Sequence, residues 1–230
     1  MSLTKKQQDQ IDYQLENHKH SRYEVDIVLA EGQILEKFIV LPDVLRPDKL
    51  IASFLSSWLF YNNGLYQDKT VIDMGCGSGI QGIVCGIYGA KKVIFSDIAT
   101  EPIDNTKENI KNYKLETKTE VYQGDLFENI KEKADLIIFN HPFWPINPTE
   151  QKVSISILGG VEVIHNFFDS VGNYLNQGGI IIMPYFHLAG EENDPGIQAP
   201  KHGLGVEVAF RAEVSKTLHT GLMSIYKIKK

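Results

Sequence analysis

The sequence predicts an α/β fold with a mostly parallel sheet, helices on both faces and an antiparallel hairpin at its C-terminal end. From residue 69 onward, short apolar runs alternate with amphipathic segments, which is the pattern of βα units. The runs are almost entirely apolar, as strands covered on both faces are. Two later runs, 206–214 and 222–228, come after a segment that is rich in glycine and proline and is predicted to be a loop. Only a short segment ending in Thr220-Gly221 separates the two runs, so they are predicted to pair antiparallel.

The first sixty residues predict a small extension before the sheet. The polar segment 1–20 carries Ile11 and Leu15 on one weak stripe, which predicts a short surface helix. Next, the runs 23–29 and 34–40 are rich in β-branched and aromatic residues on either side of a glycine-containing turn, so they predict a β-hairpin.

A second helix is predicted to end this extension. Residues 41–48 hold two prolines and predict a loop, and 49–61 has an apolar helical face that Gly64 terminates. We therefore divide the chain into an extension, 1–64, and a main domain, 65–230.

The main domain is predicted to hold five buried strands before the hairpin. They are expected at 70–74, 92–96, 119–122, 134–139 and 179–183. Helices are expected between them at 80–88, 101–113, 126–132 and 160–175.

Composition and charge narrow the class of protein. The 230 residues include 43% hydrophobic and 23% charged residues, and the net charge of -6 disfavours a surface that binds polyanions overall. With Cys76 and Cys85 in one predicted turn and helix, a disulfide framework is not expected. Neither a signal peptide nor a run of about 18 apolar residues is present, so we expect a cytoplasmic protein without membrane or metal partners.

The strongest local motif is a glycine loop after the first buried strand. Gly75, Gly77 and Gly79 alternate between that strand and the next helix, where missing side chains let a ligand reach the backbone and the free N–H groups of the helix. A tight turn without a ligand would have the same glycines. The spacing Gly77-x-Gly79-x-x-Gly82 also fits a dinucleotide fingerprint, so an NAD-dependent oxidoreductase is an alternative.

Three acids follow three predicted strands. Asp73 precedes the glycine loop and is expected to point into the pocket, which favours a cationic ligand over a pyrophosphate. Asp97, followed by Ile98, ends the second strand, where a carboxylate can accept hydrogen bonds from ribose hydroxyls. Asp125 and Leu126 follow the third strand, where Asp125 could equally be a helix N-cap.

This series resembles the cofactor site of class I S-adenosylmethionine-dependent methyltransferases, and the resemblance covers roughly residues 69–230. It implies a Rossmann-like, seven-stranded sheet whose last hairpin contains the one antiparallel strand. It also implies that the glycine loop binds the methionine part of the cofactor, the acid after the second strand the ribose, and the acid after the third strand the adenine. The cofactor residues implied are Asp73, Gly75, Gly77, Gly79, Asp97, Ile98, Asp125, Leu126 and Asn140.

A second motif, Asn140-His141-Pro142-Phe143, ends the fourth predicted strand, where open α/β sheets bind ligands. It resembles the Asn-Pro-Pro-Tyr/Phe signature of the amino-methyltransferase branch, and the chain is similar to release factor glutamine and ribosomal RNA guanine-N2 methyltransferases. The resemblance implies that the Asn140 side chain and the His141 carbonyl accept hydrogen bonds from the acceptor nitrogen, and that Phe143 stacks on its planar group. We take these four residues as catalytic.

His141 departs from the signature, which has proline there. It is either a tolerated loop residue, which we favour, or a base or substrate contact. The other histidines predict surface, helix or loop positions without a catalytic role: His18, His20, His165, His187, His202 and His219.

We therefore predict an S-adenosylmethionine-dependent N-methyltransferase that acts on a planar amide or base, in a protein or RNA acceptor. One alternative is methylation of a small molecule or a lysine amine. Others are a binding module without catalysis and the oxidoreductase. The identity of the acceptor and the oligomeric state are left open.

Overall fold

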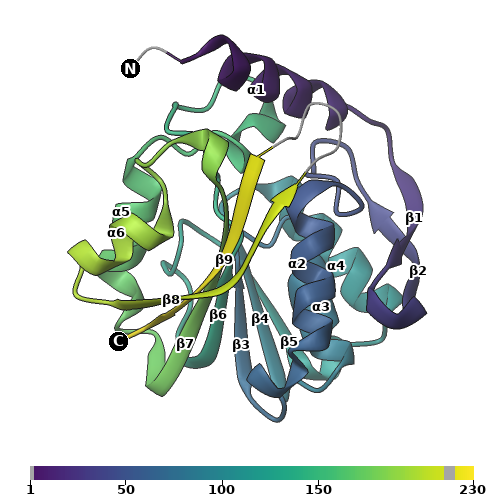
Figure 1. Ribbon diagram of the computed structural model, residues 1–230. Coiled ribbons are helices and arrows are strands. Elements are labelled where there is room, and N and C mark those ends of the chain that lie inside the picture. The colour runs from purple at the N-terminus through teal and green to yellow at the C-terminus, as the bar shows by residue number, and fades with distance from the viewer. Residues whose placement is uncertain (1–2, 215–220) are drawn as a thin grey trace.

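The protein is built on a seven-stranded sheet with a separate two-stranded hairpin beside it (Figure 1). The computed structural model describes residues 3–214 and 221–230. The sheet has the order β5-β4-β3-β6-β7-β9-β8. Its strands are β3 Thr70–Met74, β4 Lys92–Asp97, β5 Thr119–Gln123, β6 Ala134–Phe139, β7 Leu175–Phe186, β8 Gly205–Val214 and β9 Gly221–Lys229.

Strand β9 is antiparallel to both of its neighbours, β7 and β8, whereas the pairs from β5 to β7 are parallel. This confirms the predicted Rossmann-like sheet with its antiparallel C-terminal hairpin. Thr220, in the predicted turn of that hairpin, lies outside the described residues.

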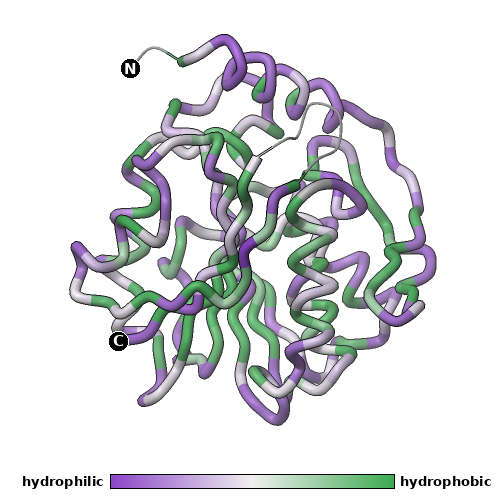
Figure 2. Tube along the Cα trace, viewed as in Figure 1, coloured by the Kyte–Doolittle hydropathy of each residue, from purple (hydrophilic) through white to green (hydrophobic). Residues whose placement is uncertain are grey.

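Helices cover both faces of the sheet, because successive residues of each buried strand point to opposite sides. Val71 packs in one apolar cluster with residues of α2 (Leu50–Tyr61), α3 (Ile80–Ile87) and α4 (Thr100–Asn112). Its neighbour Ile72 packs in a second cluster with residues of α1 (Lys5–Asn17), α5 (Glu162–Val171) and α6 (Pro195–Lys201). Figure 2 shows the apolar strands at the centre and the polar segments at the periphery.

The hairpin of β1 (Tyr23–Val28) and β2 (Ile34–Val40) docks on α4. Two buried α4 side chains hold its backbone: the amide nitrogens of Asn105 and Asn109 donate to the Ile39 carbonyl at 2.8 and 2.9 Å. The hairpin also contributes Phe38 to the first apolar cluster. The division of the chain near residue 64 remains a prediction, but the extension and the sheet share one core.

Four elements differ from the sequence-based expectations. Segment 126–132 contains turns rather than a helix, because Leu126 has a left-handed φ of 47°. The backbone hydrogen bonds there, from Glu128 to Asp125 and from Ile130 to Phe127, each close a four-residue turn. Helix α6 was predicted as loop, since its sequence contains two prolines and a glycine. Helix α5 ends at Val171 and β7 already begins at Leu175, where it pairs with Ala134.

Candidate active site

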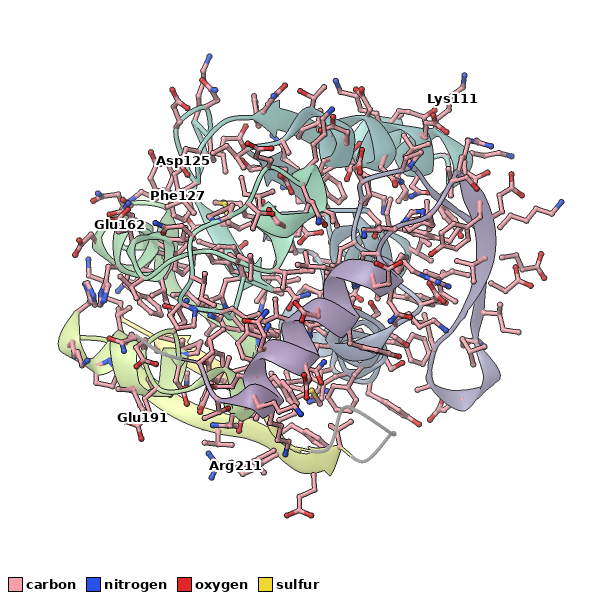
Figure 3. All side chains as sticks on the ribbon, turned by 90° about the horizontal axis from the view of Figure 1, so that it is seen from above. Lys111, Asp125, Phe127, Glu162, Glu191 and Arg211 are labelled. Carbon is pink, nitrogen blue, oxygen red and sulfur yellow. The ribbon has the colours of Figure 1, made fainter. Side chains whose placement is uncertain are left out.

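A cavity of about 130 Å³ lies where the carboxyl ends of β3, β4 and β6 meet. Its position is the crevice in which open α/β sheets bind ligands. Figure 3 looks down on this edge of the molecule and labels Asp125, which lines the cavity. The predicted residues that line the cavity are Gly75, Gly77, Asp97, Ile98, Asp125, Leu126, Asn140 and Pro142.

Asp97 joins the glycine loop to the end of β4. One carboxylate oxygen accepts a hydrogen bond from the Gly77 amide and the other from the Ala99 amide, each at 3.0 Å. Only 9% of the residue is exposed, and burial raises the pKa of the carboxyl despite these hydrogen bonds. The carboxylate is thus fixed by the backbone at the wall of the cavity.

All three loop glycines have left-handed φ values, but Gly77 and Gly79 have different structural roles. At Gly77 a Cβ atom would meet nothing within 4 Å, so this glycine leaves the cavity open. At Gly79 a Cβ would lie 2.9 Å from the Thr106 hydroxyl oxygen, and this residue does not line the cavity. Gly79 is therefore required for the packing of α3 on α4.

Asp73 does not point into the cavity, contrary to our expectation. Its carboxylate accepts a hydrogen bond from the Gly82 amide in the first turn of α3 at 2.8 Å. The residue is 2% exposed and does not line the cavity, and burial raises its pKa to about 8. The free N–H groups at the start of α3 explain this orientation, because they attract the acid that ends β3.

Leu126 carries local backbone strain at the rim. Its φ of 47° is uncommon for a residue other than glycine, and its carbonyl accepts a hydrogen bond from the Ser96 hydroxyl at 3.0 Å. Strained residues of this kind concentrate at ligand sites. The neighbouring Asp125 is exposed.

A second cavity of about 50 Å³ adjoins the first. The predicted catalytic residues His141 and Phe143 line this one, beside the buried Trp144. Asn140 lines both cavities, and its side-chain amide has no hydrogen-bond partner among the described residues. Asn140, which directly follows β6, therefore borders both cavities, and its side-chain amide is free to bind a ligand.

Several lining residues come from segments without a sequence motif. Leu45 and Ala52 line both cavities from the loop before α2 and from its first turn, and Ser156 lines both from a 3-10 helix at Lys152–Ser156. Nothing in the sequence pattern singled them out. His18, predicted to lie on the surface, is 2% exposed and lines the second cavity, whereas His219 lies outside the described residues.

Comparison with known proteins assigns the chain to a family. The profile of the methyltransferase small domain matches residues 52–188, which is more than half of the chain. The chain belongs to this family. It is therefore a methyltransferase, and the family assignment replaces the oxidoreductase alternative.

Two curated methyltransferases are similar in sequence. A Methanocaldococcus jannaschii protein, named provisionally as a protein N5-glutamine methyltransferase, is 31% identical over 64% of this chain and 77% of its own length. The release factor glutamine methyltransferase of Borreliella burgdorferi is 33% identical over 50% of this chain, but the match spans only 44% of that protein.

Solved methyltransferase structures share the fold. The T. Thermophilus 16S rRNA N2 G1207 methyltransferase, in complex with AdoMet and guanosine, superposes with a TM-score of 0.66 at 16% identity and covers 92% of this chain. About half of that protein, 51%, is matched. A ribosomal protein L11 methylase from Lactobacillus delbrueckii gives a TM-score of 0.53 at 21% identity, covering 76% of this chain and 77% of its own.

The first cavity fits S-adenosylmethionine, the cofactor of this methyltransferase. The buried Asp97 carboxylate suits the ribose hydroxyls, the Gly77 backbone leaves open space beside it, and the half-buried Leu126 offers an apolar contact for the adenine. Among residues 3–214 and 221–230, no group of three His, Cys, Asp or Glu side chains could hold a metal ion. No helix within the described ranges is long and apolar enough to cross a membrane.

Proposed function

We propose that this methyltransferase transfers the methyl group of S-adenosylmethionine to the nitrogen of a planar amide or base in a protein or RNA acceptor. The observation that supports this best is the position of Asn140, which lines both the first cavity and the smaller one lined by Phe143 and has a side-chain amide without a hydrogen-bond partner among the described residues. The names of the glutamine-modifying relatives favour an amide acceptor.

S-adenosylmethionine supplies an activated methyl group on a sulfonium. The chain's own residues have to hold the cofactor and orient the acceptor nitrogen. Gly75, Gly77, Asp97 and Leu126 hold the cofactor in the first cavity. A planar nitrogen has a delocalised lone pair, which must be localised before it can attack a methyl carbon. The Asn140 side-chain oxygen and the His141 carbonyl accept hydrogen bonds from the two N–H groups of this nitrogen and so favour the pyramidal geometry.

Phe143 is placed to stack on the planar group that carries the nitrogen. It lines the second cavity and is only partly buried. An aromatic face of this kind suits an amide or a base, because a planar group gains from stacking on it.

The test has two stages. Isothermal titration with S-adenosylmethionine measures cofactor binding, and Asp97→Ala is expected to weaken it by at least tenfold, since a buried hydrogen-bonding carboxylate is lost. Transfer of a tritiated methyl group is then measured to glutamine-containing peptides and to deproteinised ribosomal RNA, with mass spectrometry locating the product.

Asn140→Ala is expected to lower the transfer rate by about 100-fold without a matching loss of cofactor affinity. The matched control is Asn62→Ala at the end of α2, where the amide only bonds the Trp58 carbonyl outside both cavities. Full activity of Asn140→Ala, or methylation of carbon or oxygen, would contradict the proposed function.

A further inference from the structure

The His141 imidazole is buried and hydrogen-bonded to a distant part of the chain. It is 2% exposed, and its Nε2 atom lies 2.9 Å from the carbonyl oxygen of Asn193, in the linker before α6. A carbonyl at this distance requires a proton on Nε2, so the ring donates. Burial lowers the pKa of His141 to about 4, and the ring is neutral in the physiological range.

Asn193 is itself fixed by the chain that follows the acceptor motif. Its side-chain nitrogen donates to the Gly160 carbonyl at 2.7 Å, and the Gly160 amide donates to the Ile146 carbonyl at 2.9 Å. The segment 140–147, here called the acceptor loop, is therefore tied near both of its ends to one buried group of polar contacts.

The imidazole also contacts two aromatic side chains, Tyr185 and Phe143, of which Phe143 lines the second cavity. Its ring lies parallel to that of Tyr185, with centroids 5.8 Å apart and an interplanar angle of 10°. It meets the Phe143 ring edge-on, with centroids 5.2 Å apart. His141 thus packs, together with Tyr185, against the Phe143 ring that lines the second cavity.

A role as base does not fit these contacts. Nε2 already donates to Asn193, and Nδ1 is enclosed without a hydrogen-bond partner. Asp194, the charged group near the ring, raises the pKa of His141, but its effect is smaller than the lowering by burial. A base would need an accessible nitrogen with a pKa near the working pH.

We propose that His141 is a positioning residue whose hydrogen bond to Asn193 holds the acceptor loop in the shape that a proline gives to the related signature. Proline restricts the backbone through its ring, whereas histidine leaves φ free and needs an external anchor. The anchor keeps the His141 carbonyl and Phe143 aimed at the second cavity. The effect of this hydrogen bond on catalysis rests on the proposed function, but its effect on the shape of the loop does not.

The test uses Trp144, which lies in the acceptor loop and is 1% exposed. The chain has two tryptophans, so a Trp58→Phe background leaves Trp144 as the only tryptophan fluorophore. In that background His141→Ala is compared with His141→Gln, whose side-chain amide can still donate at the position of Nε2. Fluorescence, amide hydrogen exchange of residues 143–147 and titration with S-adenosylmethionine are measured for each.

We expect His141→Ala to shift Trp144 emission to the red and to speed exchange in the loop at least tenfold, while cofactor affinity changes less than threefold. His141→Gln should restore most of the emission, the exchange protection and the methyl transfer that the alanine variant loses, with an unaltered pH profile. Asn193→Ala, which frees the linker, should reproduce part of the loosening if the alanine variant at 141 is too unstable to study.

Unchanged emission and exchange in both His141→Ala and Asn193→Ala would overturn the anchor. The proposal would also be overturned if His141→Gln restored none of the emission, exchange protection or methyl transfer that His141→Ala loses. If the His141 variants lost the acidic limb of the pH profile of methyl transfer, His141 would instead be assigned as a base. If the unmodified chain methylates none of the peptide or RNA probes, the proposed function fails, but the fluorescence and exchange results still decide the role of His141.

Discussion

Gly77 offers a direct test of the cofactor cavity at the scale of one residue. Its left-handed φ of 56° and the open space where a Cβ would lie mean that alanine costs about 1–2 kcal/mol of backbone strain and also fills the cavity. Gly77→Ala is expected to weaken S-adenosylmethionine binding at least tenfold in isothermal titration. Gly32→Ala is the matched control, since Gly32 has a φ of 74° and open space at the tip of the hairpin. Equal affinities of the two variants would contradict the assignment of the cavity.

The buried His18 predicts an acid-sensitive stability. Its Nδ1 accepts a hydrogen bond from the Arg46 amide at 2.9 Å, and burial, with smaller contributions from His20 and Arg46, lowers its pKa from 6.5 to about 3. The unfolded state therefore binds the proton more readily between these values, and the contribution of His18 to stability is lost as pH falls below 6.5.

His18→Asn keeps an acceptor near the position of Nδ1 but does not titrate. The free energy of unfolding, measured with urea, should decrease less between pH 7 and pH 4.5 in this variant than in the parent protein. The difference between the two decreases should be at most about 1.4 kcal/mol per pH unit. Asp73 acts with the opposite sign, because its raised pKa favours the folded state at low pH, so the difference between variant and parent isolates His18. An identical decrease in the free energy of unfolding in both proteins would show that the pKa of His18 is not lowered in the folded state.

The residue scale is also where sequence reasoning was least complete. The glycine loop, Asp97 and Asn140 could be predicted because their positions at strand ends follow from the order of the elements. The direction of Asp73 and the burial of His18 could not, since both depend on which backbone groups the tertiary structure brings near them. Leu45 and Ser156 reach the cavities through packing alone.

At the scale of elements, α1 is more than a surface helix. Gln14 on its inner side accepts a hydrogen bond from the Trp144 indole nitrogen at 2.9 Å, and both residues are buried. Gln14→Ala leaves that indole N–H buried without its acceptor, which is expected to cost about 1–3 kcal/mol. Gln8→Ala is the control in the same helix, because Gln8 is exposed and bonds only Asp12. Similar urea midpoints for the two variants would show that α1 is not docked on the acceptor loop.

The elements that could be predicted are those with the clearest patterns. Buried parallel strands read as continuous apolar runs, so β3, β4 and β6 were predicted at their observed positions with errors of at most one residue. The sequence of α6 has a low intrinsic helix propensity. Its only sequence feature typical of a helix start is Asp194 as N-cap, followed by Pro195. Segment 126–132 was predicted as helix, whereas its apolar residues Phe127 and Ile130 fill the core without forming one.

At the scale of the whole molecule, the two faces of the sheet are expected to unfold together. The extension inserts Phe38, with no exposed surface, into the cluster that contains Val71, and its ring packs against Tyr113, the C-cap residue of α4. Removing this side chain deletes its contact with Tyr113 and leaves a cavity in the apolar cluster that the extension shares with the sheet. Phe38→Ala is therefore expected to lower the free energy of unfolding of the entire chain by about 3–5 kcal/mol.

Two tryptophans allow this cooperativity to be measured on each face separately. Trp58 packs against the cluster that holds Phe38, whereas Trp144 belongs to the cluster on the opposite face. In single-tryptophan backgrounds, Phe38→Ala should shift the urea transition seen by Trp144 as far as the one seen by Trp58, because a shared sheet couples the two clusters. Val28→Ala, at a hairpin side chain that is 60% exposed, should shift neither. A shift confined to Trp58 would mean that residues 1–64 unfold apart from the sheet, as a separate domain would.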